Sequence, residues 1–478
     1  MARGEDTVDV ELVEERDGVE VPWVGAAEPD RAADPAARAR RRRAGIVSGG
    51  LVLALVGGAF GWSGWQDRRE VQRDEARVAA LAEVPGAAPS LREPLEELWS
   101  TEVPATSLAG GLLITVDEAF GVLRTSAHDV ATGELRWRRE VARDPGDPEP
   151  RVDACEAAVQ DDRALLCEVP STGQTAPNTD AELGGDPRRL VVLDAEDGTV
   201  LHVRDLRSTT IGWRTLGDDV VVARRDDRDV LLERSALDGT VTWSTRVSDL
   251  LEEGATATNL RLAVSDGLVH VSGRAAAVLD ADGTVLGRWR GREDRDDSLQ
   301  VTTSSVGFTV VRGRGGTWAD RAGGSLASLG GRPLDATVDD GEHPYLELLQ
   351  HEGRVRAVDV RSGGVRWGTD AVDRALLRVG DLVVLDDADG LRALDLRTGE
   401  RLWEREHAPG IFPLYPVVTD GVRLLVPSWD LTEGRSMVAL DLGSGEEVWR
   451  APQPSAARVV LVERTFVHAV GDSLRVLG

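Results

Sequence analysis

The stretch LDLRTGERLW at residues 394–403 contains the local features on which the fold depends. An apolar strand end is followed by Asp395, by a short turn that closes on Gly399, and by a second strand that carries Trp403. Glycine supplies the positive φ that a tight turn needs, and Asp and Thr side chains can bond the amides of the turn. The stretch therefore predicts a β-hairpin.

The same hairpin recurs along most of the chain. Copies are HDVATGELRW (128–137), LDAEDGTVLH (193–202), SALDGTVTW (235–243), LDADGTVLGRW (279–289), VDVRSGGVRW (358–367), LDLGSGEEVW (440–449) and a weaker one, ADRAGGSLASL (319–329). Their turn glycines are Gly133, Gly198, Gly239, Gly283, Gly324, Gly363, Gly399 and Gly445, so the intervals after the first one, of 65 residues, run from 36 to 46. Short apolar or alternating runs between the copies are typical of strands. A four-stranded unit repeated at this period predicts an all-β chain folded as a β-propeller.

Tryptophan marks one position of the repeat. Seven of the 13 tryptophans stand there: Trp99, Trp137, Trp243, Trp289, Trp367, Trp403 and Trp449. A large flat ring that recurs so regularly indicates packing between blades. The chain ends in a strand, 473–478, with no turn and Trp strand after it, whereas 95–103 is a Trp strand with no turn before it. If these two pair, the ring closes and an open sheet edge is removed.

The number of blades depends on how the weak copy at 319–329 is interpreted. The eight turn motifs and a closing blade would make nine blades, whereas an insertion at 319–329 would reduce the count. We predict an eight-bladed propeller, with seven or nine blades as the alternatives.

The pattern D-x-x-[ST]-G-x-x-x-W at 129–137, 359–367, 395–403 and 441–449 resembles the pyrroloquinoline-quinone-like (PQQ-like) repeat of the quinoprotein alcohol dehydrogenase-like superfamily. That repeat builds usually eight-bladed propellers, both in quinoprotein dehydrogenases and in the propeller lipoprotein of outer-membrane protein assembly. The resemblance covers about residues 95–478. It implies the fold and leaves the function open, because enzymes and non-enzymes share the repeat.

The region before the propeller predicts a membrane anchor. Residues 1–43 are an acidic tail, predicted to be disordered, that ends in a cluster of arginines. The uncharged run 44–65 is long enough, at about 33 Å, to cross a bilayer as a single transmembrane helix. Residues 66–94 predict a helical stalk or linker, and 95–478 the propeller.

Two other interpretations of 44–65 are a cleaved signal peptide and a buried soluble helix. The long segment before the run disfavours the first, and the length of the uncharged run disfavours the second. The arginines on one side place the N-terminus in the cytoplasm and the propeller outside. The small residues Gly50, Ala54 and Gly58 leave open whether the helix dimerises.

The two cysteines fit an exported domain. Cys155 and Cys167 flank a predicted hairpin whose midpoint, residue 161, would bring them opposite each other. Opposed positions on neighbouring strands are close to the spacing that a disulfide needs. We predict a Cys155–Cys167 disulfide, with two free thiols as the alternative.

Composition excludes several kinds of chemistry. The chain of 478 residues contains no lysine, so a Walker A loop, a Schiff-base lysine and a Ser-x-x-Lys pair are absent. The net charge of −27 argues against a nucleic-acid partner. Dehydrogenases of the PQQ-like type use adjacent cysteines and often a c-type haem, but here the cysteines are twelve residues apart and no Cys-x-x-Cys-His is present.

We therefore predict no catalytic, cofactor-binding or metal-binding residues and no cofactor. The expected function is a non-catalytic, membrane-anchored, extracytoplasmic scaffold for protein interaction or ligand binding at the cell envelope, with an envelope protein as the expected partner. A quinone-dependent dehydrogenase and an extracellular sensor of a ligand or glycan are the alternatives. The sequence does not identify the partner or the face that binds it.

Overall fold

The computed structural model describes residues 69–102, 105–109, 111–119, 122–143, 154–157, 164–170, 188–207, 209–251, 260–291, 298–313, 315–370, 374–387, 389–407, 411–413, 417–430, 434–453, 459–462, 464–470 and 473–478. The chain divides into two compact units, Met1–Val71 and Gln72–Gly478. In the first unit the described residues, 69–71, are helical. The predicted tail and the predicted transmembrane helix at 44–65 lie outside the described residues.

The second unit begins with the end of a helix, described at 69–80, and a 3-10 turn, Leu81–Glu83. Within the described part of the chain, no helix has the length and apolar character needed to cross a membrane.

The strands of Gln72–Gly478 form nine sheets. Blade one is β2 (Ala105–Ala109), β3 (Leu112–Ala119), β4 (Val122–Asp129) and β5 (Leu135–Arg143), and blade two is β6 (Ala154–Ala157), β7 (Ala164–Pro170), β8 (Arg188–Asp194) and β9 (Val200–Leu206). Blade three is β10 (Thr210–Leu216), β11 (Asp219–Asp226), β12 (Asp229–Ala236) and β13 (Val241–Val247), and blade four is β14 (Arg261–Ser265), β15 (Leu268–Ser272), β16 (Ala275–Leu279) and β17 (Val285–Arg290). Blade five is β18 (Leu299–Ser304), β19 (Gly307–Arg312), β20 (Gly315–Asp320) and β21 (Ser325–Leu329).

Of the remaining blades, seven and eight contain five strands each, and blade nine takes one strand from the start of the propeller. Blade six is β22 (Arg332–Pro333), β24 (Leu346–His351), β25 (Arg354–Asp359) and β26 (Gly364–Asp370). Blade seven adds β23 (Val338–Asp339) to β27 (Arg374–Val379), β28 (Leu382–Asp386), β29 (Gly390–Asp395) and β30 (Arg401–Glu406). Blade eight is β31 (Ile411–Pro413), β32 (Val418–Thr419), β33 (Arg423–Asp430), β34 (Gly434–Asp441) and β35 (Glu447–Pro452), and blade nine is β36 (Val459–Val462), β37 (Thr465–Val470), β38 (Ser473–Leu477) and β1 (Glu97–Thr101).

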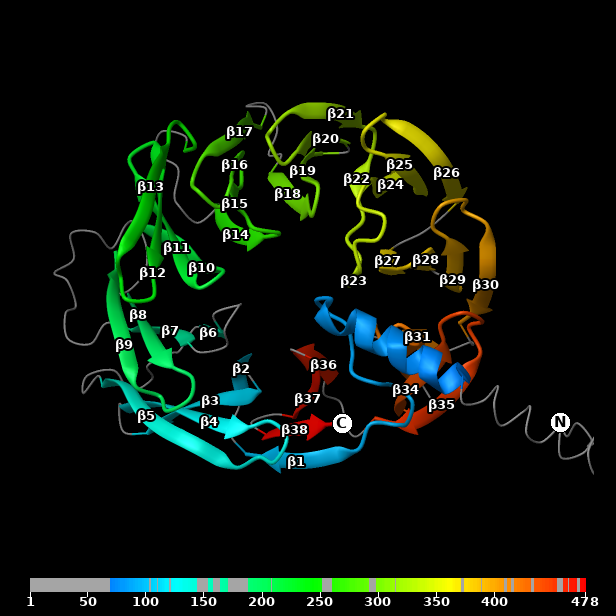
Figure 1. Ribbon diagram of the computed structural model, residues 1–478, viewed down its shortest axis with the longest axis horizontal. Coiled ribbons are helices and arrows are strands. Elements are labelled where there is room, and N and C mark those ends of the chain that lie inside the picture. Colours follow the sequence, from blue (N-terminus) through cyan, green and yellow to red (C-terminus); the bar gives the residue numbers. More distant parts are fainter. Residues whose placement is uncertain are drawn as a thin grey trace, which may run out of the picture. The chain divides into compact units, whose positions relative to one another are not determined.

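The sheets follow one another around a ring in chain order, with the first strand of each blade toward the centre and the fourth at the rim (Figure 1). Blade nine takes its outer strand from the start of the propeller, since β1 pairs antiparallel with β38, Trp99 opposite Val476. The predicted pairing of the chain's two ends is therefore confirmed, and the all-β propeller is confirmed with it.

The expected number of eight blades is wrong by one, and nine, one of the two alternatives, is the number formed. The weak copy at 319–329 is not an insertion, because it forms the end of β20, a turn and β21. The positive φ of that turn lies at Gly323 (82°) rather than at Gly324. Ala327 stands on β21, the outer strand where other blades have Trp, so the sequence signal is weak although the hairpin forms.

Burial explains the different composition of inner and outer strands. In the second strand of blade three, Val220, Val221, Val222 and Ala223 are all buried, because neighbouring blades cover both faces of the sheet. The outer strand β35 alternates between exposed and half-buried residues, as a sheet edge facing solvent does. The core thus lies in layers between adjacent blades, such as the cluster that joins the middle strands of blades three and four.

Candidate functional site

The seams between blades are bridged by the tryptophans of the outer strands. Five of these indoles donate a hydrogen bond from Nε1 to a turn carbonyl of the next blade. The donor and acceptor residues are Trp99 and Val130 (2.6 Å), Trp137 and Ala195 (2.8 Å), Trp243 and Ala281 (2.9 Å), Trp367 and Leu396 (2.7 Å), and Trp403 and Leu442 (2.9 Å). A buried indole thus contributes both apolar area and a satisfied N–H at each seam.

The turn glycines make room for these indoles. A Cβ on Gly399 would lie 2.6 Å from Cγ of Trp367, and a Cβ on Gly445 would lie 2.7 Å from Cδ2 of Trp403. Both glycines also have a positive φ, of 74° and 73°. The same contact pairs Gly133 with Trp99, Gly198 with Trp137, and Gly283 with Trp243. These positions therefore require glycine for two reasons, backbone conformation and space.

The turn aspartates hold the carbonyls in place. Asp395 Oδ1 accepts hydrogen bonds from the amides of Arg397 (3.0 Å) and Thr398 (2.8 Å) and from the Thr398 hydroxyl (2.9 Å). In blade one, the Arg136 guanidinium beside Asp129 holds the pKa of that carboxyl below its usual value, and the turn amide of Thr132 adds to the effect. Charged aspartates thus order the turns onto which the indoles pack.

Three seams depart from this pattern. Gly239 contacts the imidazole of His202, which takes the place of Trp on the outer strand of blade two. Gly363 has only the Ala327 methyl within reach, at 4.0 Å. Trp289 packs edge-on against Phe308 of blade five, with ring centroids 5.6 Å apart. The repeat position predicted from the sequence is thus occupied in different ways around the ring.

The last seam is completed by residues that the sequence analysis assigns to the linker. Trp449 Nε1 donates to the carbonyl of Leu91 at 2.8 Å, so Leu91 occupies the role that a turn residue has elsewhere. The Leu91 amide in turn donates to Asp420 Oδ2 (2.7 Å), and both residues are fully buried. The Ala88 amide donates to Thr419 O (2.8 Å). We call residues 87–91 the closing segment, because they fill the place of the turn that blade nine lacks.

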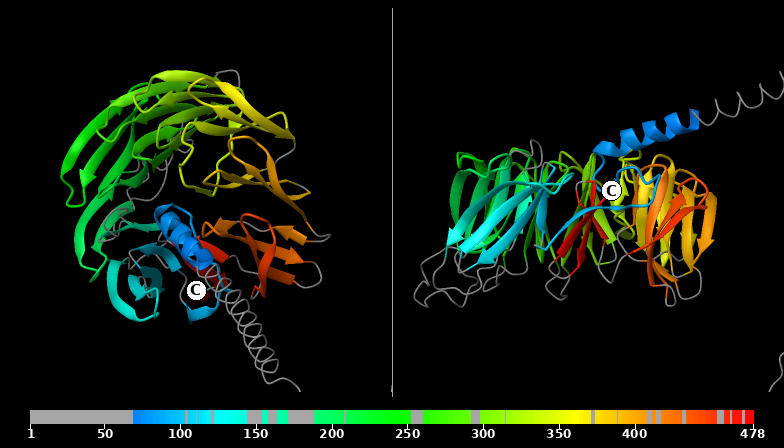
Figure 2. Two further views of the ribbon diagram at one scale, coloured as in Figure 1. Left: turned by 45° about the vertical axis from the view of Figure 1, so that its right-hand side comes forward. Right: turned by 90° about the horizontal axis from the view of Figure 1, so that it is seen from below.

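The helix and the 3-10 turn before the closing segment contact blade eight. Leu81 is buried and packs beside Gly421, and Asp74 lies 3.9 Å from a guanidinium nitrogen of Arg423. The edge-on view shows this helix running along one face of the ring (Figure 2). The chain therefore enters the propeller through a largely exposed helix, the buried Leu81 and the closing segment.

The cysteines lie opposite each other in blade two. In the antiparallel pair of β6 and β7, Cys155 is the register partner of Cys167. The predicted hairpin is therefore present. The disulfide itself stays a prediction, which thiol titration of the unreduced chain would test.

A second group of interacting residues lies between blades six and seven, in a segment for which the sequence analysis identifies no motif. Residues 334–345 leave blade six, add β23 to blade seven in parallel with β27, and return to β24. We call these residues the crossover segment. Its Asp340 Oδ2 accepts from the Gly380 amide (2.5 Å), and its Thr337 amide donates to Leu376 O (2.8 Å).

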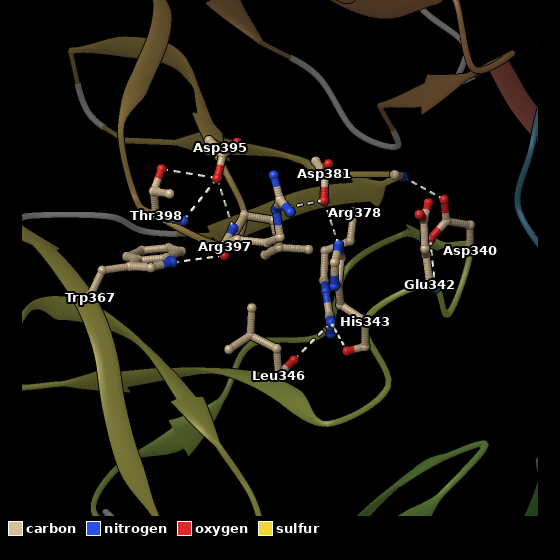
Figure 3. A network of polar contacts seen from close by, with 12 residues as sticks. Asp340, Glu342, His343, Leu346, Trp367, Arg378, Asp381, Asp395, Arg397 and Thr398 are labelled. Carbon is tan, nitrogen blue, oxygen red and sulfur yellow. Dashed lines mark hydrogen bonds and ion pairs between the residues drawn. The ribbon is translucent and has the colours of Figure 1, made fainter.

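Side chains reinforce the crossover (Figure 3). The buried Arg378 pairs with Asp339 (3.0 Å) and donates to the carbonyls of His343 (3.0 Å) and Leu346 (2.7 Å). Asp381 Oδ1 lies 2.9 Å from His343 Nε2 and 3.1 Å from Arg397 Nε. The crossover segment is thus fixed to blade seven from Thr337 to His343.

Acidic groups of the crossover segment lie near Glu347, an acid of blade six. Burial raises the pKa of Glu347, on β24, to about 7; Arg378 opposes the rise, and Asp335 and Asp339 add to it. Burial also raises the pKa of Asp335, against the effect of Arg332. Within the described ranges, no group of His, Cys, Asp or Glu side chains is arranged to hold a metal ion. The raised pKa values of Glu347 and Asp335 make folding stability depend on pH.

Comparison with known proteins bears on this arrangement. The family model described as "Outer membrane protein assembly factor BamB" matches residues 124–306 and 386–477, which is more than half of the chain. The chain belongs to the BamB family. The resemblance to PQQ-like propellers is thereby confirmed. The residues between the two matched ranges, 307–385, include β22 to β27 and therefore the whole crossover segment.

Individual relatives are distant. The outer membrane protein assembly factor BamB of Yersinia pestis is 24% identical over 308 residues, covering 62% of this chain and 70% of that protein. Among solved structures, BamB from Moraxella catarrhalis has a TM-score of 0.42 at 15% identity, covering 80% of this chain and 99% of that one. The quinohemoprotein alcohol dehydrogenase ADHIIG from Pseudomonas putida HK5 has a TM-score of 0.40 at 14% identity, covering 84% and 81%.

The indole-glycine contact makes a prediction about stability. Gly399→Ala should destabilise the chain more than Gly353→Ala, a control with a similar φ (78°) and nothing within 4 Å of the added methyl. The control should cost about 1–2 kcal/mol for its backbone conformation, and Gly399→Ala a further 1–3 kcal/mol or so for displacing Trp367. Urea unfolding measures both. The extra cost should vanish in a Trp367→Ala background; equal costs for the two glycines would contradict the contact.

The acids under the crossover segment make a prediction about pH. The unfolded chain releases the Glu347 proton near pH 4.5 and the folded chain near pH 7, so folding stability attributable to this group falls as pH rises between these values. Glu347→Gln removes the penalty and should stabilise the chain by about 2 kcal/mol more at pH 8 than at pH 5. Urea unfolding at both pH values measures the difference. The exposed Glu134→Gln is the control, and a gain independent of pH would contradict the burial argument.

Proposed function

We propose that this chain is a non-catalytic scaffold that a single helix, residues 44–65, tethers to the cell membrane, with the propeller on the extracytoplasmic side, where it binds a protein of the cell envelope. The proposal of a tether rests on how the closing segment and the 3-10 turn before it pack into the propeller. Residues 81–91 contribute buried side chains that pack against blades eight and nine and hydrogen bonds to blade eight. Because residues 81–91 are packed into the propeller, the chain that leads from the proposed tether would join the ring without a flexible linker at that point.

Membership of the BamB family supports a scaffold role. The description of that family names assembly of outer membrane proteins, and for this chain we propose only the coarser role, binding of an envelope protein. A propeller suits such a role because its rigid blades present connecting loops of independent sequence at both faces of the ring.

The test uses the full-length tagged chain in its own cells. In-cell crosslinking followed by mass spectrometry should recover the same protein partner repeatedly, with crosslinks in residues 95–478. A variant in which a cleavable signal peptide replaces residues 1–71 serves as the control: it should leave the membrane fraction and still bind the partner. The absence of a partner, or alcohol oxidation by the full chain with added quinone and Ca²⁺, would contradict a non-catalytic scaffold.

A further inference from the structure

A hollow of about 360 Å³ lies beside the crossover segment, at the seam of blades six and seven. Its lining combines residues 342–345 of that segment with Leu346, Asp359, Arg361 and Arg366 of blade six and Arg397 of blade seven. Three guanidinium groups thus meet around a cavity at the lower end of the size range of ligand pockets.

Acidic neighbours fix these guanidinium groups without using all their donors. Arg366 donates to Asp359 Oδ2 at 2.7 Å, and an Arg361 nitrogen lies 3.5 Å from the same oxygen. Arg397 pairs with Asp381 through Nε, at 3.1 Å. Each guanidinium group has five N–H donors in a planar fork, so further donors remain on all three side chains.

Both carboxylate oxygens of Asp359 are already engaged. Asp359 Oδ1 accepts from the amides of Arg361 (3.1 Å) and Ser362 (3.4 Å), while its Oδ2 serves the two arginines. The hydrogen bond from Arg366, with further help from Arg361, holds the pKa of Asp359 at about 2, so this carboxylate is charged at any physiological pH. Arg361 is also held from its other side, 4.3 Å above the ring of Tyr345. The guanidinium groups are thus positioned before any ligand arrives.

The repeat does not require this gathering of arginines. Arg361 and Arg397 stand at the same place, two residues after the turn aspartate, in consecutive blades. The other turns in which glycine follows the aspartate by four residues have Ala131, Glu196 and Gly443 at this place. The pair formed by Arg366 with Asp359 does have a counterpart, Arg136 with Asp129, but among the described residues no second arginine joins the pair in blade one. A larger hollow, of about 1040 Å³, lies at the equivalent place beside blades one and two, but Ala131 and Glu196 line it where Arg361 and Arg397 line this one. The gathering of arginines is therefore a local feature of blades six and seven.

We propose that this hollow binds a carboxylate group carried by a polypeptide segment of the partner, either an acidic side chain or a free C-terminus. Guanidinium forks match a carboxylate in a bidentate manner, which a compact cation does not. Glu342 is the remaining acid of the lining, and it would accept an N–H of the same segment, which a peptide offers and a simple anion does not. The inference rests on the proposed scaffold function, whose partner it describes by chemistry.

The test is calorimetric titration of the purified full-length chain in neutral detergent with three synthetic peptides. Two have blocked ends and differ only by Glu or Gln at the centre; the third has the central Gln and a free C-terminal carboxylate. At least one carboxylate peptide should bind, and the blocked Gln peptide should not. Arg361→Gln with Arg397→Gln should weaken binding about tenfold or more, because charge-assisted hydrogen bonds are lost. Both arginines are more than half exposed, so the fold should persist, which melting of the variant checks.

Arg401→Gln is the matched control, an exposed arginine of β30 that pairs with Glu404 outside the hollow. It should leave binding unchanged. The inference is overturned if no carboxylate peptide binds, if the double variant binds as well as the natural chain, or if inorganic phosphate binds more tightly than either carboxylate peptide. A partner that still crosslinks to the double variant would overturn the hollow as its docking point and leave the scaffold function standing.

Discussion

The contact between an outer-strand indole and the glycine turn of the next blade is the interaction on which the ring depends. A propeller blade buries both faces of its middle strands only if its neighbours are in place, so each seam must be close-packed. Trp367 on Gly399 shows how this is done: the glycine admits the ring, and Leu396 O accepts its N–H. The same three groups repeat at most seams, which gives neighbouring blades a similar relation around the ring.

Ring closure applies the same rule to a seam that has no turn of its own. Blade nine is assembled from both ends of the propeller sequence, so no hairpin follows β38 to receive Trp449. The closing segment supplies Leu91 O instead, and the buried carboxylate of Asp420 holds the Leu91 amide. Residues 87–91, which the sequence analysis assigns to a linker, are thus part of the propeller. The elements that carry the chain into the ring are consequently coupled to its stability.

How much the sequence predicts follows from how local each interaction is. The Asp, Gly and Trp positions are predictable because one hairpin contains all of them. The pairing of the two chain ends is predictable for another reason: 95–103 is a Trp strand with no turn before it, and 473–478 is a strand with no Trp strand after it. The blade count was missed because β21 has Ala327 in place of Trp, and Leu91 belongs to no motif. The crossover segment leaves no periodic signal, since its partners are on blade seven. The arginines of the hollow did carry a signal, the same turn position in consecutive repeats, but only the fold shows that these positions adjoin.

Hydrogen exchange at the Leu91 amide tests most directly the claim that the closing segment completes the ring. Proteolysis and mass spectrometry of the full chain after exchange into deuterated water can isolate a peptide that covers residues 87–91. We predict that the Leu91 and Ala88 amides exchange as slowly as those of the middle strands of blade eight, because they are released only when the ring opens. Exchange at the rate of an exposed loop would contradict this account of ring closure.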